Sequence, residues 1–167
     1  MGDLLYRKRY RIPSTRLSGW DYGLGGAYCI TICTLNRICC FGEVLEGRMV
    51  PSGLGQIVAE EWEEMARRRP YVDLDAWVVM PNHFHGILFV HPPPFGSRLR
   101  TLGTMIGQFK GACSRRIWAG GSHDFDWQER FFDQIIRDEA TLLRFRKYIL
   151  ENPLRWEKDK HHPKADR

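Results

Sequence analysis

The stretch WVVMPNHFHGILFV, residues Trp77 to Val90, decides the expected fold. Two runs rich in Val, Ile and Phe flank a Met-Pro-Asn turn at 80–82, a pattern that predicts a strand, a tight turn and a second strand. Side chains alternate between the two faces of a strand, so His83 and His85 point to the same side. Two imidazoles therefore stand next to each other near the start of a buried strand.

This histidine pair has two interpretations. Neutral imidazole is a common metal ligand, and a rigid strand keeps the separation of its side chains fixed, which favours a metal site. Two polar residues at the end of a strand can equally bond to water or to the backbone. The pattern His-x-His by itself leaves both interpretations open.

The composition indicates one soluble domain with an anionic partner. With 167 residues, 43% of them hydrophobic, the chain can bury one ordinary core. Its net charge of +5 favours a partner such as nucleic acid. Five cysteines without a C-x-x-C spacing indicate reduced thiols. Because we find neither a secretion signal nor a run of about 18 apolar residues, we expect a soluble, cytoplasmic protein.

Hydrophobic periodicity predicts the remaining elements. We expect strands at 27–35, 72–80 and 131–137, a short hairpin within 41–50, and helices at 54–69, 98–118 and 139–151. Asp73 and Asp75 share a face of the strand before the turn. If Met80 pairs with His83, Asp75 lies opposite Leu88, about 17 Å along the strand from His83. We therefore exclude the two aspartates as ligands of a site at the histidines.

The helix predicted at 98–118 carries Gly103, Gly107 and Gly111, a stripe at spacing four. Glycine costs helix stability, so such a row usually lets another backbone approach closely. We expect packing against a neighbouring element, with the approach of a sugar-phosphate chain as the alternative. The basic residues that border the stripe are Lys110, Arg115 and Arg116.

The last predicted helix carries a tyrosine on the flank of its buried face. Asp138 can cap this helix, Glu139 to Glu151, which ends before Pro153 because the residue before a proline avoids helical angles. Tyr148 and Asn152 are four residues apart and stack on one side, where a packed side chain can still reach the sheet. Packing at the boundary of the core is the alternative explanation for this tyrosine.

The two ends of the chain are polar. We expect residues 1–26 to form a basic, glycine-rich N-terminal segment, residues 27–153 the main domain, and residues 154–167 a partly disordered polar tail in which His161 and His162 have no role. In the N-terminal segment, cations alternate with tyrosines, as single-stranded nucleic acid binding requires, although a mobile terminus has the same composition. Its candidate cations are Arg7, Lys8, Arg9 and Arg11.

Taken together, these residues resemble the single-tyrosine HUH transposases and, within them, the REP-associated tyrosine transposases. The His-hydrophobic-His signature stands as His83-Phe84-His85 within VVMPNHFHGIL. The tyrosine helix and its exit stand as RKYILENPLRW, which carries Tyr148 and Asn152. WQERFFDQIIRDE is similar to the segment that leads into this helix, and YCITICTLNR and FGEV are similar to the first strands of the family.

The resemblance implies an α+β fold, with a central antiparallel sheet of the ferredoxin or RRM type and helices packed on it. It implies that His83, His85 and Asn152 bind a divalent metal, Mg²⁺ or Mn²⁺, although a glutamine takes the last position in some branches of the superfamily. Tyr148 would be the nucleophile that cuts single-stranded or hairpin DNA and joins its 5′-phosphate. Because the phosphoester bond energy is kept in the adduct, strand transfer would need no ATP.

Several basic residues are candidates for contacts to the DNA backbone. They are Arg7, Lys8, Arg9, Arg11, Lys110, Arg115, Arg116, Arg144 and Lys147. The resemblance leaves open whether the protein is a monomer or a homodimer. Two other functions also stay open: a non-catalytic nucleic-acid-binding module, and a metal-dependent phosphoesterase that uses water while Tyr148 only packs.

Overall fold

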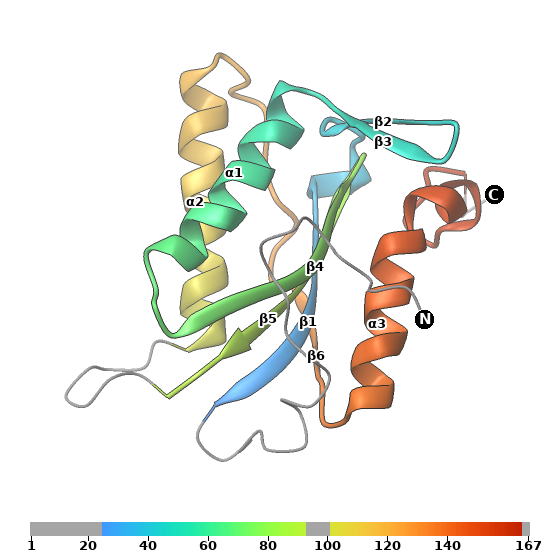
Figure 1. The fold of residues 1–167 in the computed structure, drawn as a ribbon. Helices are drawn as coiled ribbons and strands as arrows, with labels where there is room; N and C mark the ends of the chain where they lie inside the picture. Colours follow the sequence, from blue (N-terminus) through green and yellow to red (C-terminus); the bar gives the residue numbers. More distant parts are fainter. Residues whose placement is uncertain (1–24, 93–100, 165–167) are drawn as a thin grey trace.

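Four antiparallel strands form the central sheet (Figure 1). The computed structural model describes residues 25–92 and 101–164. The strands are β1 (Gly26–Cys33), β4 (Val72–Met80), β5 (His83–Val90) and β6 (Phe132–Ile135), in the spatial order β4-β5-β1-β6. A separate hairpin is made by β2 (Gly42–Leu45) and β3 (Arg48–Pro51). All predicted strands are confirmed, with ends that differ by a few residues.

Helices cover both faces of the sheet. On one face lie α1 (Gly53–Arg67) and α2 (Leu102–Ala119), and on the other lies α3 (Glu139–Glu151) (Figure 1). Each helix begins at a side chain that accepts a hydrogen bond from the backbone of the first turn. These caps are Ser52, Thr101 and, as predicted, Asp138. The protein therefore has the expected α+β fold with a central antiparallel sheet.

Each face of the sheet has its own apolar core. Under α1 and α2, the rings of Trp62 and Phe84 lie 4.7 Å apart, and both side chains are fully buried. Under α3, the fully buried Ile87 and Ile149 belong to a smaller cluster. Phe84 and Ile87 face opposite cores because side chains alternate along β5. This alternation places the two histidines of β5 on the same side as α3.

The hairpin of β4 and β5 has the predicted register at its turn and a different one further along. Met80 pairs with His83, as the sequence predicts. A β-bulge then shifts the register between residues 74 and 77, so that Leu74, not Asp75, lies opposite Leu88. The predicted pairing of Asp75 with Leu88 is therefore wrong. A bulge inserts an unpaired residue into one strand, which alternation alone does not reveal.

The two aspartates of β4 are bonded to other groups. Asp75 is buried and accepts hydrogen bonds from Arg146 on α3, with an Nη2 to Oδ2 distance of 2.6 Å. Asp73 lies 2.7 Å from Nε2 of His91. Neither aspartate belongs to the group of close ligand atoms around the histidines.

The glycine stripe of α2 does not serve close packing. A side-chain carbon added at Gly107 would meet no described atom within 4 Å, and at Gly103 only the Thr101 hydroxyl, at 3.9 Å. At Gly111 it would meet only the Arg115 guanidinium, at 3.4 Å. The expectation of a closely packed backbone is therefore wrong among the described residues. No element of the described part of the chain covers the stripe, because the apolar side of α2 alone packs on the sheet and α1.

The segment after α3 folds back onto the domain. A 3-10 helix, η3 (Pro153–Lys158), follows α3 directly. Beyond it, Asp159 and His161 are only 7% and 5% exposed. The expectation of a partly disordered tail is wrong for residues 154–164, in which His161 is packed against the domain. A short polar segment carries no apolar periodicity, so its packing has no sequence pattern.

All five cysteines are free thiols in the structure. Burial raises the pKa of Cys29 to about 12 and that of Cys40 to about 11. These thiols are therefore protonated at neutral pH and are poor nucleophiles. Within residues 25–92 and 101–164, no helix has both the length and the apolar character needed to cross a membrane.

Candidate active site

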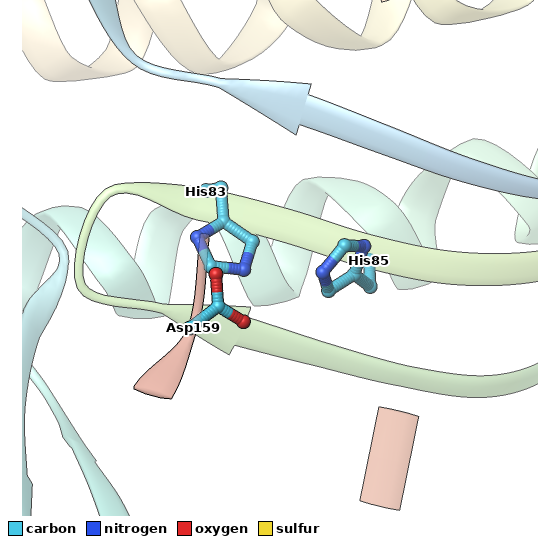
Figure 2. Close-up of side chains that lie close together, drawn as sticks. All are labelled: His83, His85 and Asp159. Atoms are coloured by element: carbon cyan, nitrogen blue, oxygen red, sulfur yellow. The ribbon is translucent and has the colours of Figure 1, made fainter. Parts of the chain in front are cut away.

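Three segments meet on the α3 side of the sheet. His83 and His85 extend from β5, Tyr148 from α3, and Asp159 from the chain after η3. Ligand atoms of the two histidines and Asp159 lie within 4.8 Å of one another (Figure 2). The Tyr148 hydroxyl lies 3.5 Å from Nε2 of His85. The structure thus brings the predicted tyrosine to the predicted histidine pair, and adds a carboxylate to them.

Asn82 in the turn fixes the proton position on His83. Its Nδ2 donates to the backbone carbonyl oxygens of Arg37 and His161, at 3.0 and 2.8 Å, which turns its Oδ1 toward Nδ1 of His83, at 2.9 Å. An amide oxygen can only accept, so Nδ1 of His83 carries the proton and Nε2 carries a lone pair. This Nε2 is buried and has no hydrogen-bond partner among the described residues. An oriented imidazole with one bonded and one free nitrogen is the usual form of a metal-binding histidine.

His85 is oriented by the neighbouring strand. Thr31 of β1 pairs with His85 in the sheet, and its hydroxyl lies 2.8 Å from Nδ1 of the imidazole. When Nδ1 donates to this hydroxyl, the lone pair of Nε2 points toward Tyr148. Both histidines therefore have an orienting partner on Nδ1 and a nitrogen that faces the site.

Asn152 lies at the C-terminal end of α3 and is buried. Its Nδ2 donates to Oδ2 of Asp159, at 3.2 Å, while its Oδ1 is buried without a hydrogen-bond partner among the described residues. Burial lowers the pKa of His83 and raises that of Tyr148, and the nearby Asn152 amide opposes both shifts. The structure therefore places the predicted third ligand beside the histidines, with its oxygen free.

Two site residues were missed by sequence reasoning. Asp159 contributes a carboxylate to the close group, and one of its oxygens accepts a hydrogen bond from the backbone N–H of His161, at 2.7 Å. The His161 ring lies 4.6 Å from the His83 ring, and its Nε2 is buried and unpartnered among the described residues. The only sequence signal was an acidic residue and a histidine at 159–161, shortly after the tyrosine helix.

Burial determines the protonation states of the histidines and of Tyr148. It lowers the pKa of His83 and His85 well below the ordinary value for histidine, and electrostatic repulsion from other histidines of the site adds to this effect. Burial also raises the pKa of Tyr148, and the nearby Asp159 carboxylate raises it further. Near neutral pH the imidazoles are therefore neutral, as metal ligands must be, and the phenol keeps its proton.

We expect the metal-free protein to lose stability as the pH falls below about 6.5. The unfolded chain then binds protons at histidines that stay neutral in the folded state, so the free energy of unfolding falls by about 1.4 kcal/mol per pH unit for each such histidine. Urea denaturation at pH 7.5 and 5.0 measures the loss, and His85→Gln should show a smaller one. Equal losses in the wild type and in His85→Gln would contradict the expectation for His85.

A cavity of about 530 Å³ opens beside the tyrosine. Its lining includes Tyr148 and His85 together with Phe132, Arg144 and Lys160. Phe132 and His85 both pair with the same β1 residue, from opposite sides, so their side chains share one face of the sheet. The cavity therefore connects the reactive groups to an exposed aromatic ring and to cations.

The predicted DNA contacts fall into three groups. Those at residues 7–11 lie outside the described residues. On α2, Lys110 donates to the carbonyl oxygens of Gln128 and Arg130, Arg116 pairs with Glu60 and Glu61, and Arg115 is exposed. This helix lies on the sheet face away from the histidines (Figure 1). On α3, Arg144 and Lys147 are exposed, and Arg144 lines the cavity.

The chain matches known proteins in sequence and in structure. No family model matches it. An uncharacterized protein of Haemophilus influenzae is 35% identical over 164 residues, which covers 87% of this chain and 90% of that protein. The solved structure of a REP-associated tyrosine transposase bound to a REP hairpin superimposes with a TM-score of 0.57 at 23% identity, and covers 96% of this chain and 77% of that one.

A putative transposase of Deinococcus radiodurans superimposes with a TM-score of 0.48 at 19% identity, and covers 81% of this chain and 94% of that one. The structural match with the REP-associated tyrosine transposase agrees with the family that the sequence motifs resemble. The chain therefore belongs to the family of the Haemophilus influenzae protein, and it has the fold of the REP-associated tyrosine transposase.

Proposed function

We propose that this protein is a transposase of the single-tyrosine HUH class, a metal-dependent endonuclease and strand transferase that acts on single-stranded DNA. The observation that carries the proposal is the Tyr148 hydroxyl 3.5 Å from Nε2 of His85, next to a group of close ligand atoms. A tyrosine that only packed at the boundary of the core would not require buried, unpartnered nitrogen and oxygen atoms beside it.

The donor set fits a divalent metal. Nε2 of His83 and Oδ1 of Asn152 are buried without hydrogen-bond partners among the described residues, which is costly unless a ligand satisfies them. We infer that His83, His85, Asn152 and Asp159 hold the metal, Mg²⁺ or Mn²⁺. When bound, such an ion would act as a Lewis acid that neutralises charge on the scissile phosphate.

Tyr148 is the proposed nucleophile. Its phenolic oxygen attacks the phosphorus, the new bond joins Tyr148 to the 5′-phosphate, and the bond to the 3′-oxygen breaks. The leaving 3′-oxygen takes up a proton and becomes a free hydroxyl, while the phenol proton passes to solvent. Attack of another 3′-hydroxyl on the phosphotyrosine reverses these steps, so strand transfer requires no nucleotide cofactor.

The position of Tyr148 supports a reaction with the histidines of its own chain. Both belong to one domain, where α3 packs on β4 and β5. The 3.5 Å separation within a single chain supports action in cis. The proposal therefore requires no partner subunit for cleavage, and holds for a monomer or a homodimer.

The cavity supports a single strand or the flank of a hairpin as the substrate. Phe132 is 64% exposed at its edge, where a base can stack, and Arg144 and Lys160 can neutralise phosphates. A single strand exposes its bases for such stacking, whereas a duplex does not. The comparison protein was solved with a REP hairpin, which supports hairpin DNA as the substrate class.

We expect Phe132→Ala to weaken the binding of single-stranded DNA by about 1–2 kcal/mol, the size of one lost base stack. Fluorescence anisotropy with a labelled oligonucleotide measures the affinity. Leu143→Ala is the matched control, because Leu143 is also exposed, at 44%, but does not line the cavity. Equal affinities for the two variants would argue against stacking at Phe132.

The function is tested by incubating the purified protein with end-labelled single-stranded DNA that contains hairpins, in the presence of Mn²⁺ or Mg²⁺. We expect a protein–DNA band that survives a denaturing gel and is absent when a chelator is added. DNA that is bound but never becomes attached would indicate a binding module. Cleavage without a covalent band would indicate a phosphoesterase that uses water.

A further inference from the structure

We propose that His161 is an additional metal-binding residue, supplied by the segment after η3, so that the site has three imidazoles. The inference rests on the metal site of the proposed function and deepens it. It concerns a residue that the sequence pattern assigns to a polar tail, and that belongs to no part of the family signature.

The imidazole of His161 lies close to the histidine pair, outside the group of ligand atoms formed by His83, His85 and Asp159. Its ring lies 4.6 Å from the His83 ring and 6.2 Å from the His85 ring. Its Nε2 is buried and has no hydrogen-bond partner among the described residues. Four buried side-chain nitrogen or oxygen atoms lack a partner in residues 25–92 and 101–164, and three of them belong to His83, Asn152 and His161. Unsatisfied buried polar atoms are rare, so three in one site indicate a missing shared ligand.

The backbone N–H, the carbonyl oxygen and Nδ1 of His161 each have a neighbouring group near the site. Its backbone N–H donates to Asp159, and its carbonyl oxygen accepts from the Asn82 amide, at 2.8 Å. Its Nδ1 lies 3.7 Å from the sulfur of Cys33. When Nδ1 donates to that sulfur, Nε2 keeps a lone pair, which is the form that binds a metal. Asn82 thus connects the two histidines, since its oxygen orients His83 and its nitrogen anchors His161.

The next residue in the chain, His162, lies in a different environment. His162 is half-buried, its ring packs against Trp156 at 4.8 Å, and its Nδ1 accepts a hydrogen bond from the backbone of Lys164. His162 is absent from the group of buried unpartnered atoms. It therefore serves as a matched control, a histidine of the same segment that does not face the site.

The test counts the imidazoles that bind Mn²⁺, with no DNA present. Pulsed EPR of the full chain, with ¹⁵N-labelled histidine, reports the number of nitrogens coupled to the bound ion. We expect three for the wild type and for His162→Gln, and two for His161→Gln. Titration followed by EPR of free Mn²⁺ should show His161→Gln binding at least about tenfold more weakly, since even indirect partners of metal ligands change affinity by that amount.

The possible outcomes distinguish a failure of this inference from a failure of the proposed function. Two nitrogens in the wild type would overturn the role of His161 while leaving a metal site made by His83 and His85. Unchanged affinity in a folded His161→Gln would overturn it as well. Absence of Mn²⁺ binding by the wild type would overturn both the inference and the metal site of the proposed function. The nitrogen count of the wild type decides the question even if His161→Gln does not fold.

Discussion

Replacing Tyr148 by Phe should abolish the covalent protein–DNA adduct. The change removes only the phenolic oxygen, which lies 3.5 Å from Nε2 of His85. Loss of a nucleophile lowers the rate by at least roughly a thousandfold, because no neighbouring group in the same position replaces it. The stability cost should stay near 1 kcal/mol, the size of one ordinary hydrogen bond.

The matched control is Tyr71→Phe. Tyr71 is partly buried in the turn just before β4 and packs against the core under α1 and α2, on the sheet face away from the histidines. Both variants should bind hairpin DNA as the wild type does, and only Tyr148→Phe should lose the labelled band on a denaturing gel. Cleavage that persists in Tyr148→Phe would show that water is the nucleophile and that the tyrosine only packs.

Replacing His85 by Ala should weaken metal binding and abolish cleavage. The imidazole is buried between the Thr31 hydroxyl and the Tyr148 phenol. The loss therefore takes away a ligand and the partner of the nucleophile at once. We expect adduct formation to fall to the level seen with a chelator, and the affinity for Mn²⁺ to fall at least about tenfold.

His91→Ala is the control for this histidine. His91 follows β5 directly, at the end far from the turn, and pairs with Asp73 rather than with site residues. After removal of metal by a chelator, added Mn²⁺ should restore cleavage in the wild type and in His91→Ala, but not in His85→Ala. Cleavage by His85→Ala at the wild-type rate would exclude this histidine from the reaction.

Local chemistry made much of the fold predictable. The turn at 80–82 and the alternation after it place both histidines on one face, and the structure has Met80 paired with His83 as expected. The helix α3 spans the predicted residues because its signals are local, a capping Asp138 before it and Pro153 after it. Tyr148 is then directed to the sheet by helical spacing alone.

Features that depend on distant partners were not predictable in this way. The bulge of β4 changes the neighbours of Asp75, and the open glycine face of α2 reflects which elements pack on that helix. Neither follows from periodicity, because the same local pattern is compatible with several arrangements of neighbouring elements. Lys110 likewise bonds to backbone carbonyls that lie 18 and 20 residues further along the chain.

The sequence by itself determined the α+β architecture, the histidine pair on one face of a strand, and the tyrosine helix that follows. Only the tertiary structure decided that Asp159 and His161 return to the same site. The Asn82 amide and the His161 carbonyl are 79 positions apart, and the Cys33 sulfur and the His161 ring 128. Contacts over such separations arise from the packing of a polar segment against the sheet, and that packing leaves no repeat in the sequence.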